Sequence, residues 1–276
     1  MTDLRRLLEA MNEKVRADPS GGLFEGTDLF AEIAAGRHYI SALNRLLADQ
    51  LDTEADNQIF TSGRFLVLEE CGTVELTLIR YPASMSHIYS SPNRFVQIEV
   101  SGVSFTCDHY AGPACIGGPL FDPSVVLALS SSERISSGRI VSKDLDDVID
   151  LHDFTRSPAI FLRVAQAPER DFEWAFDRSS LRAHSYSTIR LAESNLCALF
   201  DLLGGYGDED SIDLVAAFAT HPLHFVRWKA VQTVGRLDRQ HGMVLAHQAL
   251  ADEHPHVRGA ARATLEAGQE ASSGWC

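Results

Sequence analysis

The sequence predicts an α+β protein in which an antiparallel β-barrel or jelly roll is flanked by amino-terminal helices and by a carboxy-terminal helical segment. Apolar residues recur at helical spacing up to about residue 56, alternate with a period of two across residues 57–188, and return to helical spacing from residue 189. In the middle segment, Gly, Pro, Ser and Asp turns separate short strands, and no helix is long enough for a βαβ crossover. This pattern is typical of an antiparallel sandwich or barrel.

Two amphipathic helical segments are expected before the strands. Residues 3–16 carry apolar side chains at helical spacing, and Asp18 and Pro19 end the run. A second segment covers residues 27–51 and is divided at Gly36. Because each segment has an apolar face to bury, we assign residues 1–56 to helices that pack on the barrel.

The β domain is assigned to residues 57–188, and it opens with a hairpin whose turn lies at Cys71 and Gly72. The segment 112–123 is too rich in Gly and Pro for a central strand, so we expect it to form a loop over one mouth of the barrel. Strands are predicted at residues 65–68, 74–81, 95–100, 104–106, 125–129, 139–141, 148–151, 159–164 and 172–176.

The carboxy-terminal segment is helical and contains an internal repeat. Val226, Arg227, Ala230 and Val234 recur 31 residues later as Val257, Arg258, Ala261 and Leu265. This pattern resembles a HEAT-like helical repeat, in which the two arginines would tie neighbouring units together. We assign residues 189–270 to this domain and 271–276 to a flexible tail, with a first helix that ends at Gly204 and Gly205.

The composition excludes several classes of partner and site. With 38 acidic and 24 basic residues the formal charge is -14, and no Lys/Arg run is present, so neither nucleic acid nor an anionic membrane is an expected partner. No apolar run reaches the roughly 18–20 residues of a membrane span, and the charged amino terminus does not resemble a signal peptide, so a cytoplasmic protein is expected. Five cysteines without a Cys-x-x-Cys pair indicate reduced thiols.

A polar cluster directly before the strand at residues 95–100 is the best candidate for chemistry. It contains His87, Tyr89, Asn93 and Arg94, and the strand after it closes at Gly102. Side chains in such a position would lie on a rigid wall of the barrel. The sequence therefore predicts a pocket here.

This stretch resembles the first motif of the cupin, or double-stranded β-helix, superfamily. His87 and Tyr89 stand at the two positions of its His-x-His pair, Asn93 or Arg94 stands where its acidic ligand belongs, and Gly102 lies near its closing glycine. In the second motif, His152 matches the last histidine. The resemblance implies a divalent iron, manganese or zinc ion held by His87 and His152, with Tyr89 or Arg94 orienting the substrate.

Three functions remain open from the sequence. The first is a metal-dependent enzyme, such as an oxygenase, that acts on a small molecule or peptide in the barrel. The second is a non-catalytic adaptor that binds a protein partner through the HEAT-like repeats. The third is a metal-independent isomerase or cyclase in which Tyr89, His87 and Arg94 serve as acid, base and anion anchor.

Two further groups of residues have alternative interpretations. Cys107, His109 and Cys115 offer either a zinc or nucleophile site or, more simply, one thiol buried in a strand and another in a loop. Four histidines flank the prolines that precede the repeat helices: His221, His224, His254 and His256. Their number suggests a metal site, but a side chain at the start of a helix can cap backbone N–H groups, and we expect this structural role.

Overall fold

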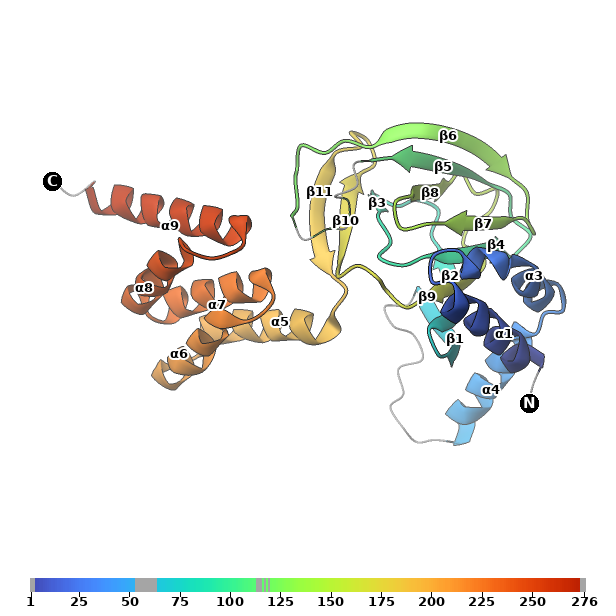
Figure 1. Cartoon of the computed structure of the whole chain (residues 1–276), viewed down its shortest axis with the longest axis horizontal. Helices are drawn as coiled ribbons and strands as arrows, with labels where there is room; N and C mark the ends of the chain where they lie inside the picture. Colours follow the sequence, from blue (N-terminus) through green and yellow to red (C-terminus); the bar gives the residue numbers. More distant parts are fainter. Residues whose placement is uncertain (1–2, 53–63, 113–115, 117, 119, 274–276) are drawn as a thin grey trace. The chain divides into compact units, whose positions relative to one another are not determined.

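The computed structural model describes residues 3–52, 64–112, 116, 118 and 120–273. The chain forms two compact units, Met1–Ser187 and Thr188–Cys276 (Figure 1). The first unit holds the amino-terminal helices together with all the strands, and the second holds the carboxy-terminal helices. The predicted α+β class, with antiparallel sheets between two helical segments, is confirmed.

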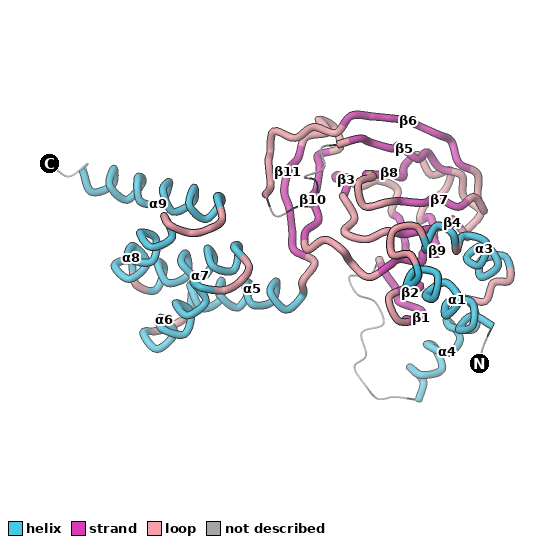
Figure 2. Tube along the Cα trace, viewed as in Figure 1, coloured by secondary structure: helices cyan, strands magenta, loops and turns pink. Residues whose placement is uncertain are grey.

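The amino-terminal helices cover one face of the β structure, as Figure 2 shows. Leu8 and Met11 on the first helix are fully buried in the same cluster as Leu76, Leu162 and Val164 on the strands. The predicted helix at 3–16 and the predicted division at Gly36 are both confirmed. The helices are α1 (Asp3–Ala17), α2 (Gly22–Glu25), α3 (Thr27–Ala35) and α4 (Tyr39–Asp52).

Most of the predicted strands are present, and the structure adds two. The added strands, β3 and β11, are short or polar and give no alternating apolar signal, and β6 begins later than the predicted 125–129. The strands are β1 (Phe65–Cys71), β2 (Val74–Tyr81), β3 (His87–Tyr89), β4 (Phe95–Glu99), β5 (Phe105–Ala111), β6 (Ala128–Ile135), β7 (Ile140–Lys143), β8 (Val148–His152), β9 (Ala159–Gln166), β10 (Phe172–Asp177) and β11 (Ala183–Thr188).

The strand order is that of a jelly roll. One sheet has the order β1-β2-β9-β4-β7, a second has β6-β5-β8, and a third has β11-β10-β3, in which β3 pairs with β10 and also lies beside β8. Strands β2 to β9 therefore form two facing sheets, β2-β9-β4-β7 and β6-β5-β8-β3, wound as a double-stranded β-helix. The predicted jelly roll is confirmed.

The sheet β1-β2-β9-β4-β7 is buried on both faces because it lies between the helices and the barrel interior. On β9, Leu162 and Val164 pack among the helices, whereas Phe161 packs in the barrel interior. Since successive side chains of a strand point to opposite faces, Arg163 points to the same side as Phe161. This alternation brings an arginine into the barrel.

The first hairpin turns where the sequence predicts it. Gly72 has a φ of 62°, a conformation that glycine adopts without strain, and a Cβ at this position would lie 2.5 Å from the side chain of Asn12. The Oδ1 atom of Asn12 accepts hydrogen bonds from the backbone N–H and the hydroxyl of Thr73. The turn is thereby tied to α1.

The second unit contains the predicted helical segment, with two differences at helix ends. The first helix continues through Gly204 and Gly205 to Tyr206, because Gly204 serves a close packing contact: a Cβ there would lie 3.0 Å from Cδ of Arg236. The last helix runs to Ser273, into the predicted tail, and residues 274–276 lie outside the described residues. The helices are α5 (Leu191–Tyr206), α6 (Glu209–Ala216), η1 (Ala217–Thr220), α7 (His224–Leu237), α8 (Arg239–Ala249) and α9 (Pro255–Ser273).

The 31-residue repeat has a structural counterpart. Arg227 donates from Nη1 to the backbone carbonyls of His221 and Pro222, and Arg258 donates from Nη1 to those of Asp252 and Glu253. Each arginine thus closes the loop before its own helix at the same sequence offset. The likeness of these helices to HEAT repeats stays a prediction.

Arg227 also connects the two copies of the 31-residue repeat. Its Nε and Nη2 atoms donate to the carboxylate of Asp252, at 2.8 and 2.7 Å, and Asp252 lies in the loop before α9.

Among the described residues, no helix has both the length and the apolar character to cross a membrane.

We predict that Leu8→Ala lowers the free energy of unfolding of the first unit by about 2–5 kcal/mol, since it leaves a cavity between α1 and the sheet. Urea unfolding measures the loss. Glu13→Ala, on the exposed side of the same helix, is the matched control and should change the value by less than about 0.5 kcal/mol. Equal losses in the two variants would contradict this packing.

Candidate functional site

A cavity of about 330 Å³ lies between the two sheets of the jelly roll. Both sheets contribute side chains to its wall, as does the stretch before β3. The lining residues are Arg64, Phe65, Tyr81, Met85, His87, Ile88, Tyr89, Ser91, Phe95, Lys143, Ile149, Asp150, Leu151, Arg163 and Glu173. Its size is at the lower end of the usual range for small-molecule sites.

Arg163 is the best-anchored cation of this pocket. Its Nε and Nη2 atoms donate to Oε1 of Gln97 at 3.1 and 2.8 Å, and Nη2 also donates to the hydroxyl of Tyr81 at 2.9 Å. The guanidinium carbon lies 3.9 Å from the ring centroid of Phe95, a cation–π contact. These contacts hold a charged group in place inside the barrel.

Two more cations line the same cavity. Lys143 is 1% exposed, its Nζ donates to the backbone carbonyls of Ser91 and Asp144, and burial lowers its pKa to about 8. Arg64 has a buried Nε without a hydrogen-bond partner among the described residues. A buried donor in this state is costly, so an acceptor brought by a ligand would stabilise it.

Two carboxyl groups, those of Glu173 and Asp150, line the same cavity and can partly balance the positive charge. Burial raises the pKa of Glu173 to about 7, although Arg163, Lys143 and Arg64 act in the other direction. Asp150 forms an ion pair with Arg178, which leaves its charge largely compensated. Near neutral pH the pocket therefore has more positive than negative charge, and Glu173 is close to half ionised.

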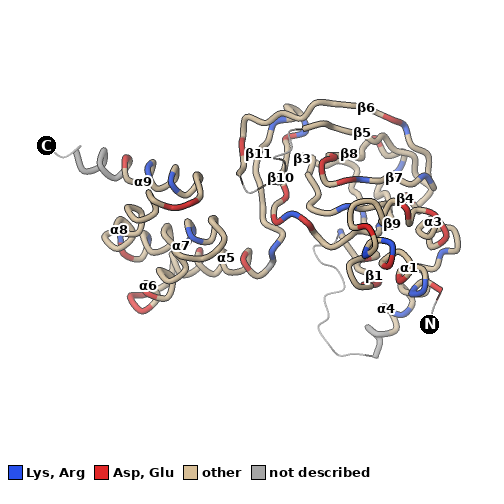
Figure 3. The backbone as a smooth tube through the Cα atoms, viewed as in Figure 1, with Lys and Arg blue, Asp and Glu red and all other residues tan. Residues whose placement is uncertain are grey.

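The positive charge of the pocket is local and differs from the net negative charge of the whole protein. Figure 3 shows acidic and basic residues interspersed along the chain of the first unit, and the formal charge of the whole protein is -14. The cavity therefore gathers three cations within a protein of net negative charge.

Two of the predicted site residues, His87 and Tyr89, line this pocket. Both lie on β3, where they share one face of the strand. The hydroxyl of Ser86 lies 2.8 Å from Nδ1 of His87, and the His87 ring lies 4.9 Å from that of His184, between centroids. Tyr89 is 39% exposed, so it stands where solvent reaches the pocket.

The structure places Arg94 outside the pocket. Its Nε donates to Asp144 at 2.6 Å, and it forms a second ion pair with Glu169. Both carboxylates lie in loops, and Arg94 also reaches the backbone of Pro19. This arginine ties loops together, and its role in catalysis stays a prediction.

His152 is also separate from His87. Leu151 of β8 packs in the barrel interior with Phe105 and Phe161, so alternation directs the adjacent His152 to the other face of the sheet, and His152 does not line the pocket. There its Nε2 lies 2.9 Å from the carboxylate of Asp108 and its Nδ1 lies 3.1 Å from that of Asp153. The cupin resemblance implies that His87 and His152 hold one metal ion, but the strands direct their side chains to opposite faces.

Within the part of the chain that the structure describes, the two predicted metal ligands of the barrel, His87 and His152, do not belong to one group of three potential ligands. Among the described residues, the one group of three potential metal ligands is formed by His224, His254 and His256 in the second unit, and neither His87 nor His152 belongs to it. The iron, manganese or zinc site at His87 and His152 stays a prediction.

The interpretation of Cys107 as a buried strand thiol is supported. Cys107 is fully buried in the barrel core, and burial raises the pKa of its thiol to about 12, so it is not ionised near neutral pH. Its Sγ lies 3.5 Å from Nε2 of His109. Cys115 lies outside the described residues, as does part of the predicted 112–123 loop.

Sequence reasoning missed the four residues that give the pocket most of its charge: Arg64, Lys143, Arg163 and Glu173. One signal was available, because Arg163 and Glu173 each interrupt an otherwise apolar strand. A charge within a buried strand costs free energy unless it has partners, so it often indicates a site. Lys143 stands at the end of β7, next to a run of aspartates that is typical of a solvated turn.

Comparisons with known proteins add a fold likeness alone. No family model matches the chain, and no curated protein matches it. A structure of oxalate decarboxylase is 11% identical, with a TM-score of 0.29, over 51% of this chain and 32% of that chain. A hydroquinone 1,2-dioxygenase in complex with Cd2+ and 4-hydroxybenzonitrile is 9% identical, with a TM-score of 0.27, over 38% of this chain and 64% of that chain.

An RmlC-like cupin protein with a double-stranded β-helix fold, from Methanocaldococcus jannaschii, is 14% identical with a TM-score of 0.24, over 42% of this chain and 86% of that chain. Similarities this distant assign no activity. The first unit is a double-stranded β-helix domain, and this class rests on its own strand order.

We predict that Glu173 makes the stability of the first unit depend on pH between 4.5, the ordinary pKa of a glutamate, and about 7. Across this range the folded protein keeps a proton that the unfolded chain has released, so the free energy of unfolding falls as pH rises. Urea unfolding at several pH values should show a flatter dependence for Glu173→Gln than for wild type. Glu13→Gln, an exposed control, should retain the wild-type slope, and an unchanged slope in Glu173→Gln would contradict the assignment.

Proposed function

We propose that the jelly-roll pocket binds a small anionic molecule, such as a carboxylate, and that the domain catalyses a metal-independent proton transfer on it. The observation that carries this proposal is the charge of the cavity. Arg64, Lys143 and Arg163 line it together with one buried carboxyl group, Glu173, whose pKa is raised to about 7. This is the third of the functions that the sequence leaves open, with different residues in the main roles.

The arginines are suited to hold the anion. Arg163 is fixed through Nε and Nη2, and neither of those bonds uses its Nη1 atom. Arg64 adds the buried Nε that lacks a partner among the described residues. Because a guanidinium presents several N–H donors in one plane, each arginine can bind a carboxylate through more than one hydrogen bond.

Glu173 is suited to move the proton. A general acid or base works best when its pKa lies near the working pH, and burial brings that of Glu173 to about 7. In the proposed step, Glu173 takes a proton from the carbon next to the substrate carboxylate, and the electron pair of the broken C–H bond is held as an enolate. The ammonium of Lys143 and the guanidinium of Arg163 stabilise that negative charge, and return of the proton to another atom of the enolate completes an isomerisation.

His87 and Tyr89 stand at the pocket as further proton carriers. A histidine on the wall can relay a proton to solvent near neutral pH. The pair retains, in part, the acid and base roles that the sequence predicts for these residues, whereas the anion is bound by other arginines than Arg94.

A metal-dependent enzyme is the second candidate. The proximity of His87 to His184, with 4.9 Å between ring centroids, favours it, since two neighbouring imidazoles are a partial ligand set. Activity that survives a chelator would support proton transfer, whereas activity that needs added metal and is lost in both His87→Ala and His184→Ala would favour the metal.

The adaptor function also stays a prediction. The second unit presents several exposed apolar side chains on α5 and α6, which suit contact with a protein: Leu199, Leu202, Tyr206 and Leu214.

We predict that inorganic phosphate and malonate bind the wild-type protein and raise its Tm, because a ligand of the folded state stabilises it. Arg163→Met should weaken binding, measured by calorimetry, by at least about tenfold, the effect of roughly 1.4 kcal/mol. Arg139→Met, which removes an exposed arginine paired with Glu133, is the matched control and should bind as wild type does. Equal binding by all three proteins would place the anion elsewhere.

We further predict that anion binding tightens as pH falls from about 8 through 7, because Lys143 and Glu173 both gain protons in this range. Glu173→Gln should bind phosphate more tightly than wild type at pH 8, by roughly tenfold, since it removes a negative charge from the cavity. A variant damaged in its fold would not gain affinity, so this outcome is distinct from misfolding. Weaker binding by Glu173→Gln would overturn the proposed charge balance.

A further inference from the structure

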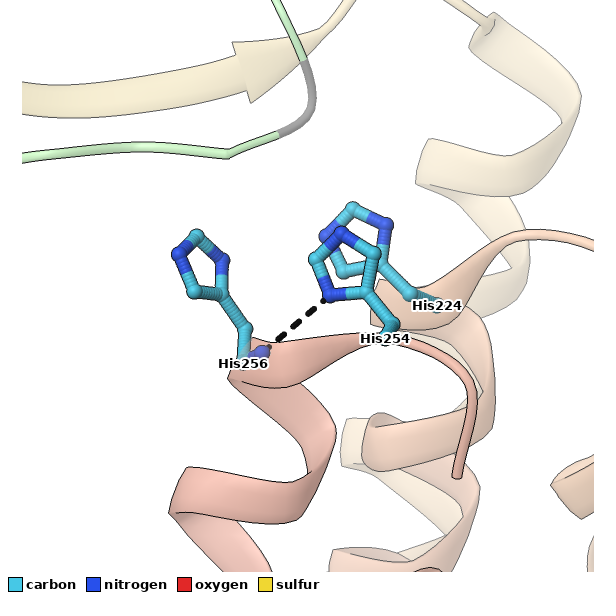
Figure 4. Close-up of side chains that lie close together, drawn as sticks. All are labelled: His224, His254 and His256. Carbon is cyan, nitrogen blue, oxygen red and sulfur yellow. Dashed lines mark hydrogen bonds between the residues drawn. The ribbon is translucent and has the colours of Figure 1, made fainter. Parts of the chain in front are cut away.

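Three histidines gather where the two repeat helices begin, as Figure 4 shows. His224 is the first residue of α7, while His254 precedes α9 and His256 lies in its first turn. The starts of α7 and α9 are brought together by the 31-residue repeat, and the Arg227–Asp252 ion pair holds them there. The cluster therefore depends on the contact between the repeat units.

The rings are close enough to share one ion. One nitrogen from each ring lies within 4.8 Å of a nitrogen from each of the others. The rings of His224 and His254 are stacked with centroids 3.6 Å apart, and the ring of His256 lies 5.1 Å from that of His254. Close packing of three imidazoles is unfavourable if they are protonated, so the cluster suits neutral rings.

His254 provides the second observation that points to a ligand. Its Nδ1 accepts the backbone N–H of His256, as expected for a capping histidine, and this fixes the ring. Its Nε2 is buried and has no hydrogen-bond partner among the described residues. A buried imidazole nitrogen in this state needs an explanation, and a bound metal supplies one.

Histidine binds a metal through a neutral imidazole, and the surroundings of His224 and His254 favour this form. Burial lowers the pKa of His224 to about 4, and burial also lowers the pKa of His254, with neighbouring histidines and Arg227 acting in the same direction. These surroundings favour the neutral form of both rings, in which one nitrogen carries a lone pair. The positive charge of Arg227 is compensated by the carboxylate of Asp252.

We propose that His224, His254 and His256 bind a divalent transition metal, zinc foremost, which joins the starts of α7 and α9. Three imidazoles are a donor set suited to zinc, with a water as fourth ligand. Zinc–nitrogen bonds of about 2.0–2.1 Å place two ligand nitrogens roughly 3.4 Å apart, so the stacked rings must turn and close on the ion. His256 is only half-buried, which leaves its side chain room to turn.

The site is independent of the function proposed for the barrel, because it uses residues of the second unit alone. Its effect is on the helical unit: an ion held by the starts of both repeat helices stabilises the folded state by mass action. Of the four histidines expected to cap backbone groups, His221 and His254 do so, and the same Nδ1 bond on His254 leaves its Nε2 for the metal.

The test is calorimetric titration of the full-length protein, freed of metal with a chelator, with zinc chloride. Wild type should bind one equivalent, and His254→Ala and His256→Ala should each bind at least about tenfold more weakly, the effect of roughly 1.4 kcal/mol. Matched controls are His241→Ala and His247→Ala, two histidines of the same unit outside the cluster, which should bind as wild type does. Cobalt(II) in place of zinc should give the visible absorption of a tetrahedral site in wild type and lose it in His256→Ala.

His87→Ala distinguishes this site from one in the barrel. If it keeps the zinc equivalent while His256→Ala loses it, the metal is in the helical unit. If His87→Ala loses the zinc and His256→Ala keeps it, or if wild type binds no zinc, the proposal is overturned. Because His256 is half-exposed, circular dichroism of His256→Ala should match wild type without metal, and added zinc should raise the Tm of wild type alone.

Discussion

Burial of the sheet β1-β2-β9-β4-β7 on both faces is the constraint on which the first unit depends. One face needs α1 to α4 as a cover, and the other needs the second sheet of the jelly roll. The second face is apolar at one end, where Phe105 and Phe161 pack, and carries Arg163 further along β9. The pocket lies in the part of the barrel interior where charged side chains replace apolar ones.

The charges of this pocket are stabilised by their surroundings and by each other. Arg163 has Gln97, Tyr81 and the ring of Phe95, and Lys143 has two backbone carbonyls. Such contacts keep the cations charged in a region where isolated charges would be costly. Burial favours the neutral form of all these groups: it lowers the pKa of Lys143 to about 8 and raises that of Glu173 to about 7. One environment therefore provides both an anion site and a proton carrier.

The helical unit also contains a buried arginine, Arg227, whose contacts fix neighbouring groups in place. Arg227 binds two backbone carbonyls of its own loop and the carboxylate of Asp252 in the next loop, and thereby sets the distance between the starts of α7 and α9. That distance decides where His224, His254 and His256 meet. In each unit, then, a buried arginine positions the groups that are candidates for binding.

The sequence by itself determined the α+β class, an antiparallel sandwich or barrel and the order of nearly all the elements, because hydrophobic periodicity is a local property. The narrower prediction of a jelly roll came from the resemblance to the cupin superfamily. It did not show β3 and β11, which are short or polar, or the end of α5, where Gly204 is needed for packing against Arg236 and not for a cap. It identified His87 and Tyr89 in the pocket, because the cupin-like motif lies on one strand.

Only the tertiary structure decided the rest of the site. His152 is separated from His87 because residues on neighbouring strands can face opposite sides of a sheet, and Arg94 is drawn to Asp144 and Glu169 in loops that are distant in sequence. Lys143, Arg163 and Glu173 come from three strands, so no spacing in the sequence brings them together. Their shared pocket, and the pKa that burial gives to Glu173, exist only once the sheets have closed.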